Sequence, residues 1–161
     1  MNQLTPESVT AYLHQQMPLT LAMGLQVTQI DDDMTRLVAP LEPNLNHQQT
    51  AFGGSIAALG ITAGWVYLHA RLHREGIVRP RLIIQKSQVE YLHPIASEME
   101  ACCGLPEAGE WEAFIIRLRD KGRARINRPA QIQGQGRIGA IHHGTYVAII
   151  ESLAQRTGVM G

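Results

Sequence analysis

The sequence has a long stretch without any formally charged side chain, and this absence is its most informative feature. Residues 43–70, PNLNHQQTAFGGSIAALGITAGWVYLHA, contain no Asp, Glu, Lys or Arg, although 17% of the chain is charged. A helix that is neutral on every side must be surrounded by protein or by lipid. The stretch lacks the Leu, Ile and Val density of a membrane span and includes Gly60, Thr62 and His69. We therefore favour a helix wrapped by a sheet over a membrane-spanning helix.

The sequence also shows no net charge, no signal-peptide pattern in its first residues and no two cysteines far apart in the chain. The chain has 14 basic and 14 acidic residues, so no net field recruits nucleic acid or an anionic membrane. The first residues, MNQLTPESVTAYLHQQM, show no basic stretch followed by an apolar one, so we expect no signal peptide and a cytoplasmic protein. Cys102 and Cys103 are adjacent and cannot join distant elements, which indicates free thiols. Cys103 could be a nucleophile, but no base stands beside it in the sequence.

No repeat, low-complexity tract or linker divides the 161 residues, so we expect one domain over residues 1–161. Thr5-Pro6-Glu7 predicts the start of a short helix that runs to about Gln16 and stops before Pro18. Apolar residues then alternate on either side of Asp31–Asp33, which predicts an antiparallel strand pair. The members of this alternation are Leu25 and Val27, followed by Leu37, Ala39 and Leu41.

The second half of the chain reads mainly as strands. The neutral helix is expected to end near Glu75-Gly76, and residues 81–92 form a strand that His93-Pro94 terminates. Residues 107–121 predict a short amphipathic helix, and residues 123–133 and 137–150 predict two more strands. Around SEMEACCGL, the residues expected on one buried face of a strand are Met99, Ala101, Cys103 and Leu105, and the helix after it would bury Trp111, Phe114, Ile115 and Leu118.

These elements predict an α+β fold in which an antiparallel sheet of about six strands curls around one long central helix. A single sheet of this size leaves open edges and cannot cover the helix completely. Trp65, Tyr67 and Leu68 continue the apolar helix beyond what one small sheet should cover. We therefore expect a homodimer that joins two sheets edge to edge, with a dimer of dimers as a further possibility.

Several short motifs in a fixed order resemble a known family. They are N-x-N-x-x-x-T-x-F-G-G-S at residues 44–55, AGW at 63–65, VEYLHPI at 89–95, KGRARI at 121–126 after the helical insertion, and GTYVAI at 144–149. In this order they resemble hot-dog-fold acyl-thioester proteins, most closely the YiiD C-terminal domain group of thioesterases. The resemblance covers residues from about Leu19 to Ile150.

The resemblance implies a hot-dog fold and a homodimer that binds acyl-CoA or acyl-carrier-protein thioesters between its subunits, with no metal and no organic cofactor. In similar thioesterases a backbone N–H at the start of the central helix polarises the thioester carbonyl, and a carboxylate two turns into that helix supplies the base or nucleophile. The position that corresponds to this carboxylate is Ile61 here. No Asp or Glu stands between Glu42 and Glu75, so another segment or the partner subunit would have to supply an acid.

Candidate site residues cluster around the Gly-Gly pair. Gly54 and Ser55 are expected to present N–H groups to the developing oxyanion. The less favoured alternative for the glycines is close helix–strand packing, and Ser55 could equally be an ordinary first-turn residue. Asn46 could orient the attacking water or simply form a turn. Thr50 could act in catalysis or be the N-cap of the helix. Asn44, Phe52 and Gly53 are expected to contact the substrate.

Two further groups of residues have both a functional and a structural interpretation. His47, or one of His142 and His143, could replace the missing base, although a lone polar-loop histidine is more often a surface residue. His142 and His143 would lie on opposite faces of a strand, so only one can face a given site. Arg123 and Arg125, with Arg128 nearby, could bind a nucleotide phosphate or an acidic carrier protein, or form a solvated face.

The leading hypothesis is therefore an acyl thioesterase that hydrolyses acyl-CoA or acyl-carrier-protein thioesters by water attack. The alternative is a binding module that has kept the acyl-thioester pocket and lost the catalytic carboxylate, which Ile61 favours. A third hypothesis is a dehydratase or hydratase. It is weaker because such enzymes resemble a pattern with His in a Pro/Gly-rich loop and an acid on the helix, and neither is visible here.

Overall fold

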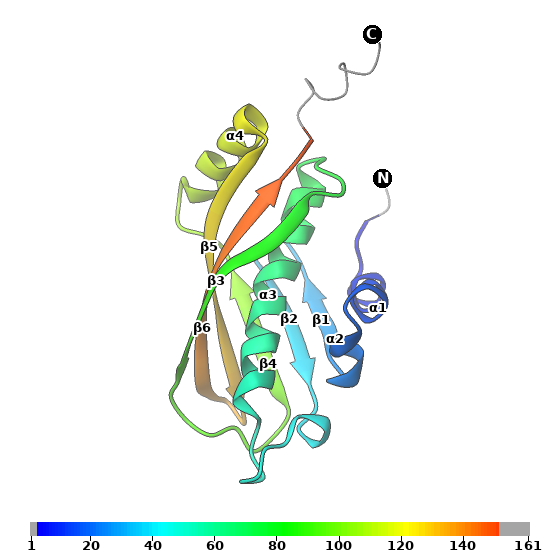
Figure 1. Ribbon diagram of the computed structural model, residues 1–161, viewed down its shortest axis with the longest axis vertical. Helices are drawn as coiled ribbons and strands as arrows, with labels where there is room; N and C mark the ends of the chain where they lie inside the picture. The colour runs from blue at the N-terminus through cyan, green and yellow to red at the C-terminus, as the bar shows by residue number, and fades with distance from the viewer. Residues whose placement is uncertain (1–2, 152–161) are drawn as a thin grey trace.

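The computed structural model describes residues 3–151 as a six-stranded antiparallel sheet with one long helix packed on it (Figure 1). The strands run in the order β1-β2-β4-β5-β6-β3, and every neighbouring pair is antiparallel. The predicted fold class is confirmed. The strands are β1 (Gln26–Ile30), β2 (Met34–Ala39), β3 (Arg81–Tyr91), β4 (Met99–Gly104), β5 (Arg123–Gly134) and β6 (Arg137–Ile149), and the helices are α1 (Pro6–Gln16), α2 (Pro18–Ala22), the 3-10 turn η1 (Glu42–Asn44), α3 (Gly53–Arg74) and α4 (Glu110–Lys121).

Helix α1 begins as predicted, with a reciprocal cap. The Thr5 side chain accepts a hydrogen bond from the Ser8 backbone N–H, and the Ser8 side chain accepts one from the Thr5 backbone N–H. The predicted end of α1 near Gln16, before Pro18, is confirmed. Pro18 opens the short helix α2, because proline at the first helical position loses no hydrogen bond.

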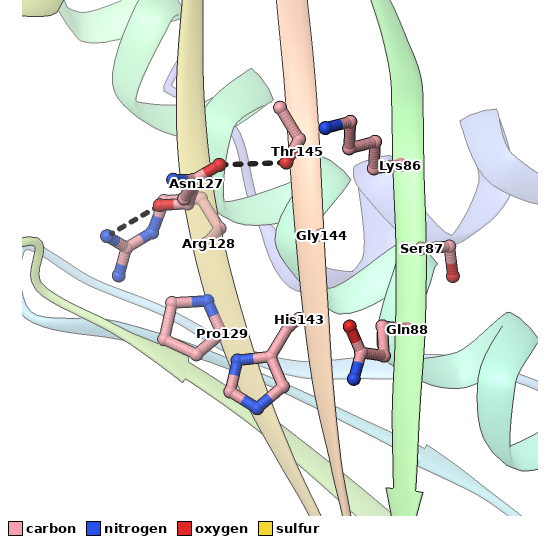
Figure 2. A pocket seen from close by; sticks show the side chains of 9 residues that line it. All are labelled: Lys86, Ser87, Gln88, Asn127, Arg128, Pro129, His143, Gly144 and Thr145. Atoms are coloured by element: carbon pink, nitrogen blue, oxygen red, sulfur yellow. Dashed lines mark hydrogen bonds between the residues drawn. The ribbon is translucent and has the colours of Figure 1, made fainter.

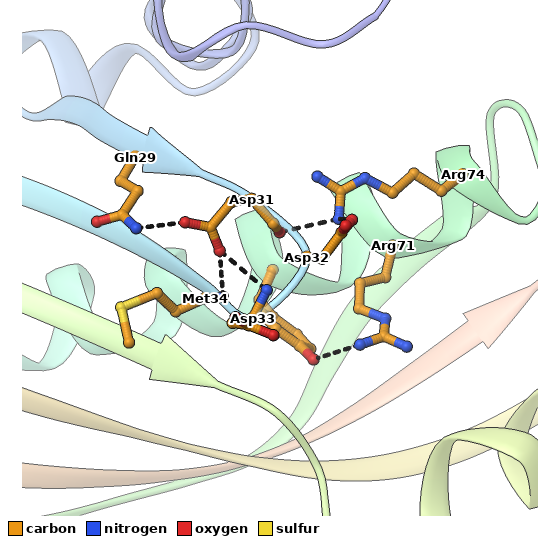
Figure 3. Close-up of polar contacts among 8 residues, drawn as sticks. Gln29, Asp31, Asp32, Asp33, Met34, Arg71 and Arg74 are labelled. Carbon is orange, nitrogen blue, oxygen red and sulfur yellow. Dashed lines mark hydrogen bonds and ion pairs between the residues drawn. The ribbon is translucent and has the colours of Figure 1, made fainter.

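The Asp31–Asp33 turn joins β1 to β2 as predicted, and Figure 3 shows how it is held. The Asp31 carboxylate accepts hydrogen bonds from the backbone N–H groups of Asp33 and Met34, and the side chain of Gln29 donates to it as well. The Gln29 hydrogen bond, followed by these backbone N–H groups, lowers the pKa of Asp31. Arg74, in the last turn of α3, pairs with Asp32 at 2.9 Å and ties the end of the central helix to this turn.

Helix α3 packs closely on the sheet because two of its sheet-facing residues are glycines. A Cβ atom at Gly60 would lie 2.6 Å from Cβ of His142, and one at Gly64 would lie 2.3 Å from the Tyr146 hydroxyl. The helix ends with Glu75 and with Gly76 at a φ of 75°, as predicted. In the described residues no helix has the length and apolar character needed to cross a bilayer.

The face of α3 turned away from the sheet is only partly covered. Trp65 and His69 stack on each other with ring centroids 4.7 Å apart, and Tyr12 of α1 stacks on both. Ile61, Trp65 and His69 all remain partly exposed. The expectation of a helix buried on all sides thus holds for the sheet-facing side only, because α1 reaches just part of the opposite side.

Strands β4 and β5 bury the alternate residues that their sequences predict, with one exception. Leu105 is 55% exposed rather than buried, because β4 ends at Gly104 and the chain turns away before α4. Arg128 lies on the opposite face of β5 from Arg123 and Arg125, as the alternation predicts. It continues the inward-facing series of β5, is only 3% exposed, and lies 5.0 Å above the Tyr67 ring.

Strand β3 lies at one edge of the sheet and pairs only with β6 within the part of the chain that the structure describes. It is 11 residues long, and most of its residues are exposed. The large apolar residues Ile83, Tyr91 and Leu92 are 47%, 57% and 47% exposed. A long edge strand with exposed apolar side chains offers a full set of backbone groups for pairing with another strand.

Candidate functional site

The first turn of α3 leaves its backbone N–H groups without acceptors from a capping side chain. The N-cap is Phe52, whose side chain cannot accept a hydrogen bond, and its carbonyl accepts the N–H of Ile56. The N–H groups of Gly53, Gly54 and Ser55 precede that bond and have no partner within the helix. In a helix of 22 residues the dipole adds partial positive charge at this end. The start of α3 can therefore hold an anion or a polarised carbonyl oxygen.

Thr50 is not the N-cap, which corrects one of its two predicted roles. Its hydroxyl lies 2.9 Å from Nδ2 of Asn46, from which it accepts a hydrogen bond, in a tight turn two residues before the helix. The Asn46 carbonyl oxygen Oδ1 accepts from the backbone N–H groups of Gln48 and Thr50 at 2.8 and 3.1 Å. The nitrogen and the oxygen of the Asn46 amide thus both stabilise the turn that precedes Phe52.

A pocket of about 230 Å³ opens beside the start of α3. It brings together four of the predicted site residues with three apolar residues contributed by α2 and the segment that follows it. Sequence reasoning missed the contribution of α2, although Pro18 carries the signal of a helix start. The lining residues are Leu19, Ala22, Met23, Pro43, Asn44, Phe52, Gly54, Ser55 and Ala58.

Asn44 is the buried polar residue of this pocket. It is 2% exposed, and its Nδ2 atom donates hydrogen bonds to the carbonyls of Met23 and Pro40 at 2.9 and 2.7 Å. Its oxygen Oδ1 is buried and has no hydrogen-bond partner within residues 3–151. Because an unsatisfied buried acceptor costs free energy, this oxygen is suited to receive a donor from a bound ligand.

Two aromatic rings lie against the Gly-Gly pair. The ring of Phe52 folds back over Gly54, so that a Cβ atom there would lie 2.4 Å from the ring. The Tyr91 hydroxyl donates a hydrogen bond of 2.8 Å to the Gly53 carbonyl and ties the helix start to the edge strand β3. Close packing therefore explains part of the need for glycine. Phe52 is 55% exposed, so its ring has room to move away from Gly54.

Carboxylates are missing from the lining of the pocket. Ile61, two turns along α3, is partly exposed, and Glu42 is exposed on η1 outside the lining residues. Within residues 3–151 no group of three or more His, Cys, Asp and Glu side chains is placed to hold a metal ion. Any base for hydrolysis must then come from another part of the molecule or from a second subunit.

The candidate histidines lie away from the helix start. His47 is exposed in the turn, and His143 lies on the outer face of β6 in a groove of about 650 Å³ (Figure 2). His142 points inward and is completely buried, so the prediction of opposite faces is confirmed. Burial lowers the pKa of His142 to about 4 and raises the pKa of Cys103 to about 11. The Cys103 thiol is consequently protonated and inert at neutral pH.

Arg123 and Arg125 lie at the other end of the sheet from the pocket. Arg123 pairs with Ile149, which also pairs with Arg81, whereas Tyr91 at the helix start is ten residues further along β3. At about 3.3 Å per residue this separation is about 30 Å. Both arginines are exposed and line an outer groove with Arg117 and Lys121 of α4. The structure does not bring them to the other predicted site residues.

Comparison with known proteins supports the same fold. The profile of the family described as "Putative thioesterase (yiiD_Cterm)" matches residues 6–150. A solved protein of unknown function from Chlorobaculum tepidum TLS is 28% identical, with a TM-score of 0.84 over 92% of this chain and 99% of that one. A putative thioesterase from Shewanella oneidensis is 22% identical, with a TM-score of 0.76 over 89% and 96%. A thioesterase from Haemophilus influenzae is 12% identical, with a TM-score of 0.70 over 94% of each chain.

Proposed function

The chain belongs to this YiiD C-terminal thioesterase family, and from that premise we propose that it hydrolyses acyl thioesters of coenzyme A or of acyl-carrier protein. The observation that carries the proposal is the uncapped start of α3, which opens into an apolar pocket. Such a pocket accepts the acyl end of a thioester, while N–H groups nearby are aimed at its carbonyl oxygen.

In this proposal the N–H groups of Gly54 and Ser55 stabilise the oxyanion that forms when water attacks the carbonyl carbon. Phe52 and Gly53 contact the substrate. The Nδ2 atom of Asn44 already donates to two backbone carbonyls, so its unpartnered Oδ1 atom is the one that accepts a hydrogen bond from the ligand. Asn46 and Thr50 act by fixing the turn that sets the position of the helix start. Proton removal from the water requires a base from outside the pocket lining.

We also propose that the working unit is a homodimer in the cytoplasm, formed by pairing of β3 with β3 of a second copy. The free edge of β3 supports this pairing, as do the exposed Ile83 on the strand and Leu92 directly after it. Tyr91 on the same strand contacts Gly53, so the pairing also places the second subunit beside the site. Sedimentation equilibrium should give twice the monomer mass of 17.8 kDa, and a monomer at micromolar concentration would contradict the proposal.

In the dimer, Arg123 and Arg125 are proposed to receive the anionic part of the carrier, either the nucleotide phosphates of coenzyme A or an acidic carrier protein. Their guanidinium groups are exposed and make no ion pair within residues 3–151, so they are available to a phosphate or a carboxylate. A double Arg123→Ala, Arg125→Ala variant should raise KM for such substrates and leave kcat nearly unchanged.

The direct test is thiol release by the purified dimer from a panel of short, medium, long-chain and aryl acyl-CoAs and acyl-carrier-protein thioesters. Release from at least one of them supports the hydrolase. The second candidate function, a non-catalytic acyl-thioester binding module, is favoured by Ile61 at the place of the family acid. It predicts heat of acyl-CoA binding in calorimetry and no thiol release over hours.

A further inference from the structure

A groove lined by basic side chains lies between helix α4 and strand β5. Its two hollows, of about 610 and 300 Å³, share Arg117 and Arg125 in their linings. Lys121 and Arg123 also line the larger hollow, so four exposed basic side chains follow this α4–β5 groove. The groove therefore combines the two arginines of β5 that are proposed to receive the carrier with two cations of α4.

Little negative charge balances these four cations. Within residues 3–151 the three arginines make no ion pair. Lys121 lies 3.3 Å from Asp120, but both side chains are mostly exposed, so water screens this pair. Glu110 is the single acid in the lining of the two hollows, and it lies 3.8 Å from the buried Arg128. The groove therefore attracts an anionic partner although the chain has no net charge.

The shape of the groove suits a helix better than a nucleotide. On α4 it extends from Ala113 to Lys121, which is about 12 Å at 1.5 Å per residue and equals two helical turns. The aromatic residue in its lining, Phe114, is only 4% exposed, so an adenine base finds no ring on which to stack. Ile116, beside Arg117, is 68% exposed and offers an apolar contact to a protein. A row of carboxylates on one face of a helix would meet these cations along its length.

Within one subunit the α4–β5 groove is too far from the start of α3 to serve it. Figure 1 shows α4 and the first turn of α3 at opposite ends of the molecule. The corresponding ends of β3 are about 30 Å apart. A phosphopantetheine tether has about 13 bonds between phosphorus and sulfur, and at 3.3–3.6 Å per three bonds it spans only about 15 Å.

The proposed pairing of β3 with β3 of a second copy brings the groove of one subunit to the site of the other. Antiparallel pairing places the Arg81 end of one strand beside the Tyr91 end of its partner. In the sheet order β6 and β5 follow β3, and Ile149 of β6 pairs with both Arg81 and Arg123. Three strand spacings, about 14 Å, then separate Tyr91 of one subunit from Arg123 of the other. This separation matches the length of the tether.

We propose that the α4–β5 groove of one subunit binds an acidic helix of a carrier protein whose thioester is hydrolysed in the other subunit. This docking rests on the proposed function and selects the carrier protein, rather than coenzyme A, as the partner. Carboxylates of the helix pair with the four cations, and the tether crosses the dimer seam toward Gly54.

The test compares octanoyl-loaded acyl-carrier protein with octanoyl-CoA as substrates of the intact dimer. Arg117→Glu reverses a charge on α4, outside the pocket at the helix start. We expect KM for the carrier protein to rise about tenfold with kcat unchanged, and KM for octanoyl-CoA to stay within about twofold of wild type. Arg137→Glu, an equal change of charge at an exposed site on β6 outside the groove, is the matched control and should leave both KM values unchanged.

Two results overturn the docking. An equal rise of KM for both substrates would assign the groove to the phosphates of coenzyme A, and an unchanged KM for the carrier protein would assign it to neither. Calorimetry with the carrier protein separates the docking from catalysis. Binding that Arg117→Glu weakens, without thiol release from any substrate, refutes the hydrolase alone, whereas thiol release with a normal carrier-protein KM in Arg117→Glu refutes the docking alone.

A mixed dimer tests whether the groove serves the opposite subunit. One subunit carries Gly54→Val, which removes its site, and the other carries Arg117→Glu. Docking across the seam leaves one intact groove facing one intact site, so we expect about half of the wild-type kcat with the wild-type KM for the carrier protein. A KM as high as that of the Arg117→Glu homodimer would show that each groove serves its own subunit and would overturn the proposal.

Discussion

The hydroxyl of Tyr146 donates a 2.7 Å hydrogen bond to the backbone carbonyl of Ile61 and so joins β6 to the middle of α3. Ile61 is the residue at which the resemblance to hot-dog thioesterases implies a carboxylate. The Tyr146 ring fits against Gly64, and burial raises the pKa of its hydroxyl, which therefore stays protonated and donates at neutral pH. Tyr146 thus fixes the middle of the central helix against the sheet.

Substitution Gly54→Val should abolish hydrolysis, with at least about a hundredfold loss of turnover, because its side chain obstructs the oxyanion position. The valine also displaces the exposed Phe52 ring, which can move into solvent, so the dimer should survive. Thiol release and sedimentation are measured together. Gly104→Val is the control, because a Cβ atom there would meet nothing nearer than 3.9 Å. Normal turnover in a dimeric Gly54→Val variant would mean that the two glycines serve only close packing.

Two substitutions of Asn46 separate its turn-forming role from direct catalysis. Asn46→Asp keeps the oxygen that accepts from Gln48 and Thr50, whereas Asn46→Ala removes it. We expect the aspartate variant to retain most of the turnover and the alanine variant to lose it partly, along with about 1 kcal/mol of stability. Equal losses of turnover in both variants, with unchanged thermal unfolding, would indicate a direct role for the amide nitrogen.

Asn44→Ala should lower the free energy of unfolding by roughly 2–4 kcal/mol. The substitution removes two buried hydrogen bonds and leaves the carbonyls of Met23 and Pro40 without their donor. Urea unfolding measures the change. Asn127→Ala, on the exposed face of β5, should cost less than about 1 kcal/mol. A similar small cost for Asn44→Ala would show that water replaces the amide.

Substitution Gly60→Ala should destabilise the fold although alanine favours helices by about 1 kcal/mol over glycine. The new Cβ would lie 2.6 Å from Cβ of His142, which is anchored to the sheet and cannot rotate away. Overpacking of this kind costs about 1–3 kcal/mol, so the net effect should be a lower midpoint of urea unfolding. Gly104→Ala is the open-space control, and a raised midpoint for Gly60→Ala would mean that α3 can shift freely on the sheet.

The stability of the protein should depend on pH through His142. Its folded pKa of about 4 lies below the unfolded value of 6.5, because burial and the neighbouring His143 disfavour the charged form. The unfolded state therefore binds the proton first, and stability that is fully present above about pH 6.5 is lost as the pH falls toward 4. By pH 4.5 the loss should reach about 2–3 kcal/mol.

Urea unfolding between pH 7 and pH 4.5 measures how the free energy of unfolding changes with pH. This pH dependence should largely disappear in His142→Gln and persist in His143→Gln, since the side chain of His143 is exposed. An unchanged slope in folded His142→Gln would assign the pH dependence to other groups.

The sequence by itself determined most of the local structure and the family. Period-two alternation located the strands, and the burial of alternate residues in β5 follows it from Ala124 to Ile132. The uncharged stretch identified the central helix. Gly76 and Gly122 marked the ends of two helices, because glycine readily adopts the positive φ that both residues have in the structure. These features succeed because they depend on neighbours in the chain, whose side chains alternate or repeat with a fixed period.

Only the tertiary structure decided which residues meet. Asn44 is buried because the carbonyls of Met23 and Pro40 surround its amide, and a sequence pattern gives no sign of such a contact. Ser87 and His142 are brought together by the register between β3 and β6, in which a shift of one residue would turn one side chain to the other face. Arg128 follows the alternation of β5, but only the tertiary structure shows that its buried guanidinium lies over the Tyr67 ring, because that ring comes from α3, far away in the sequence.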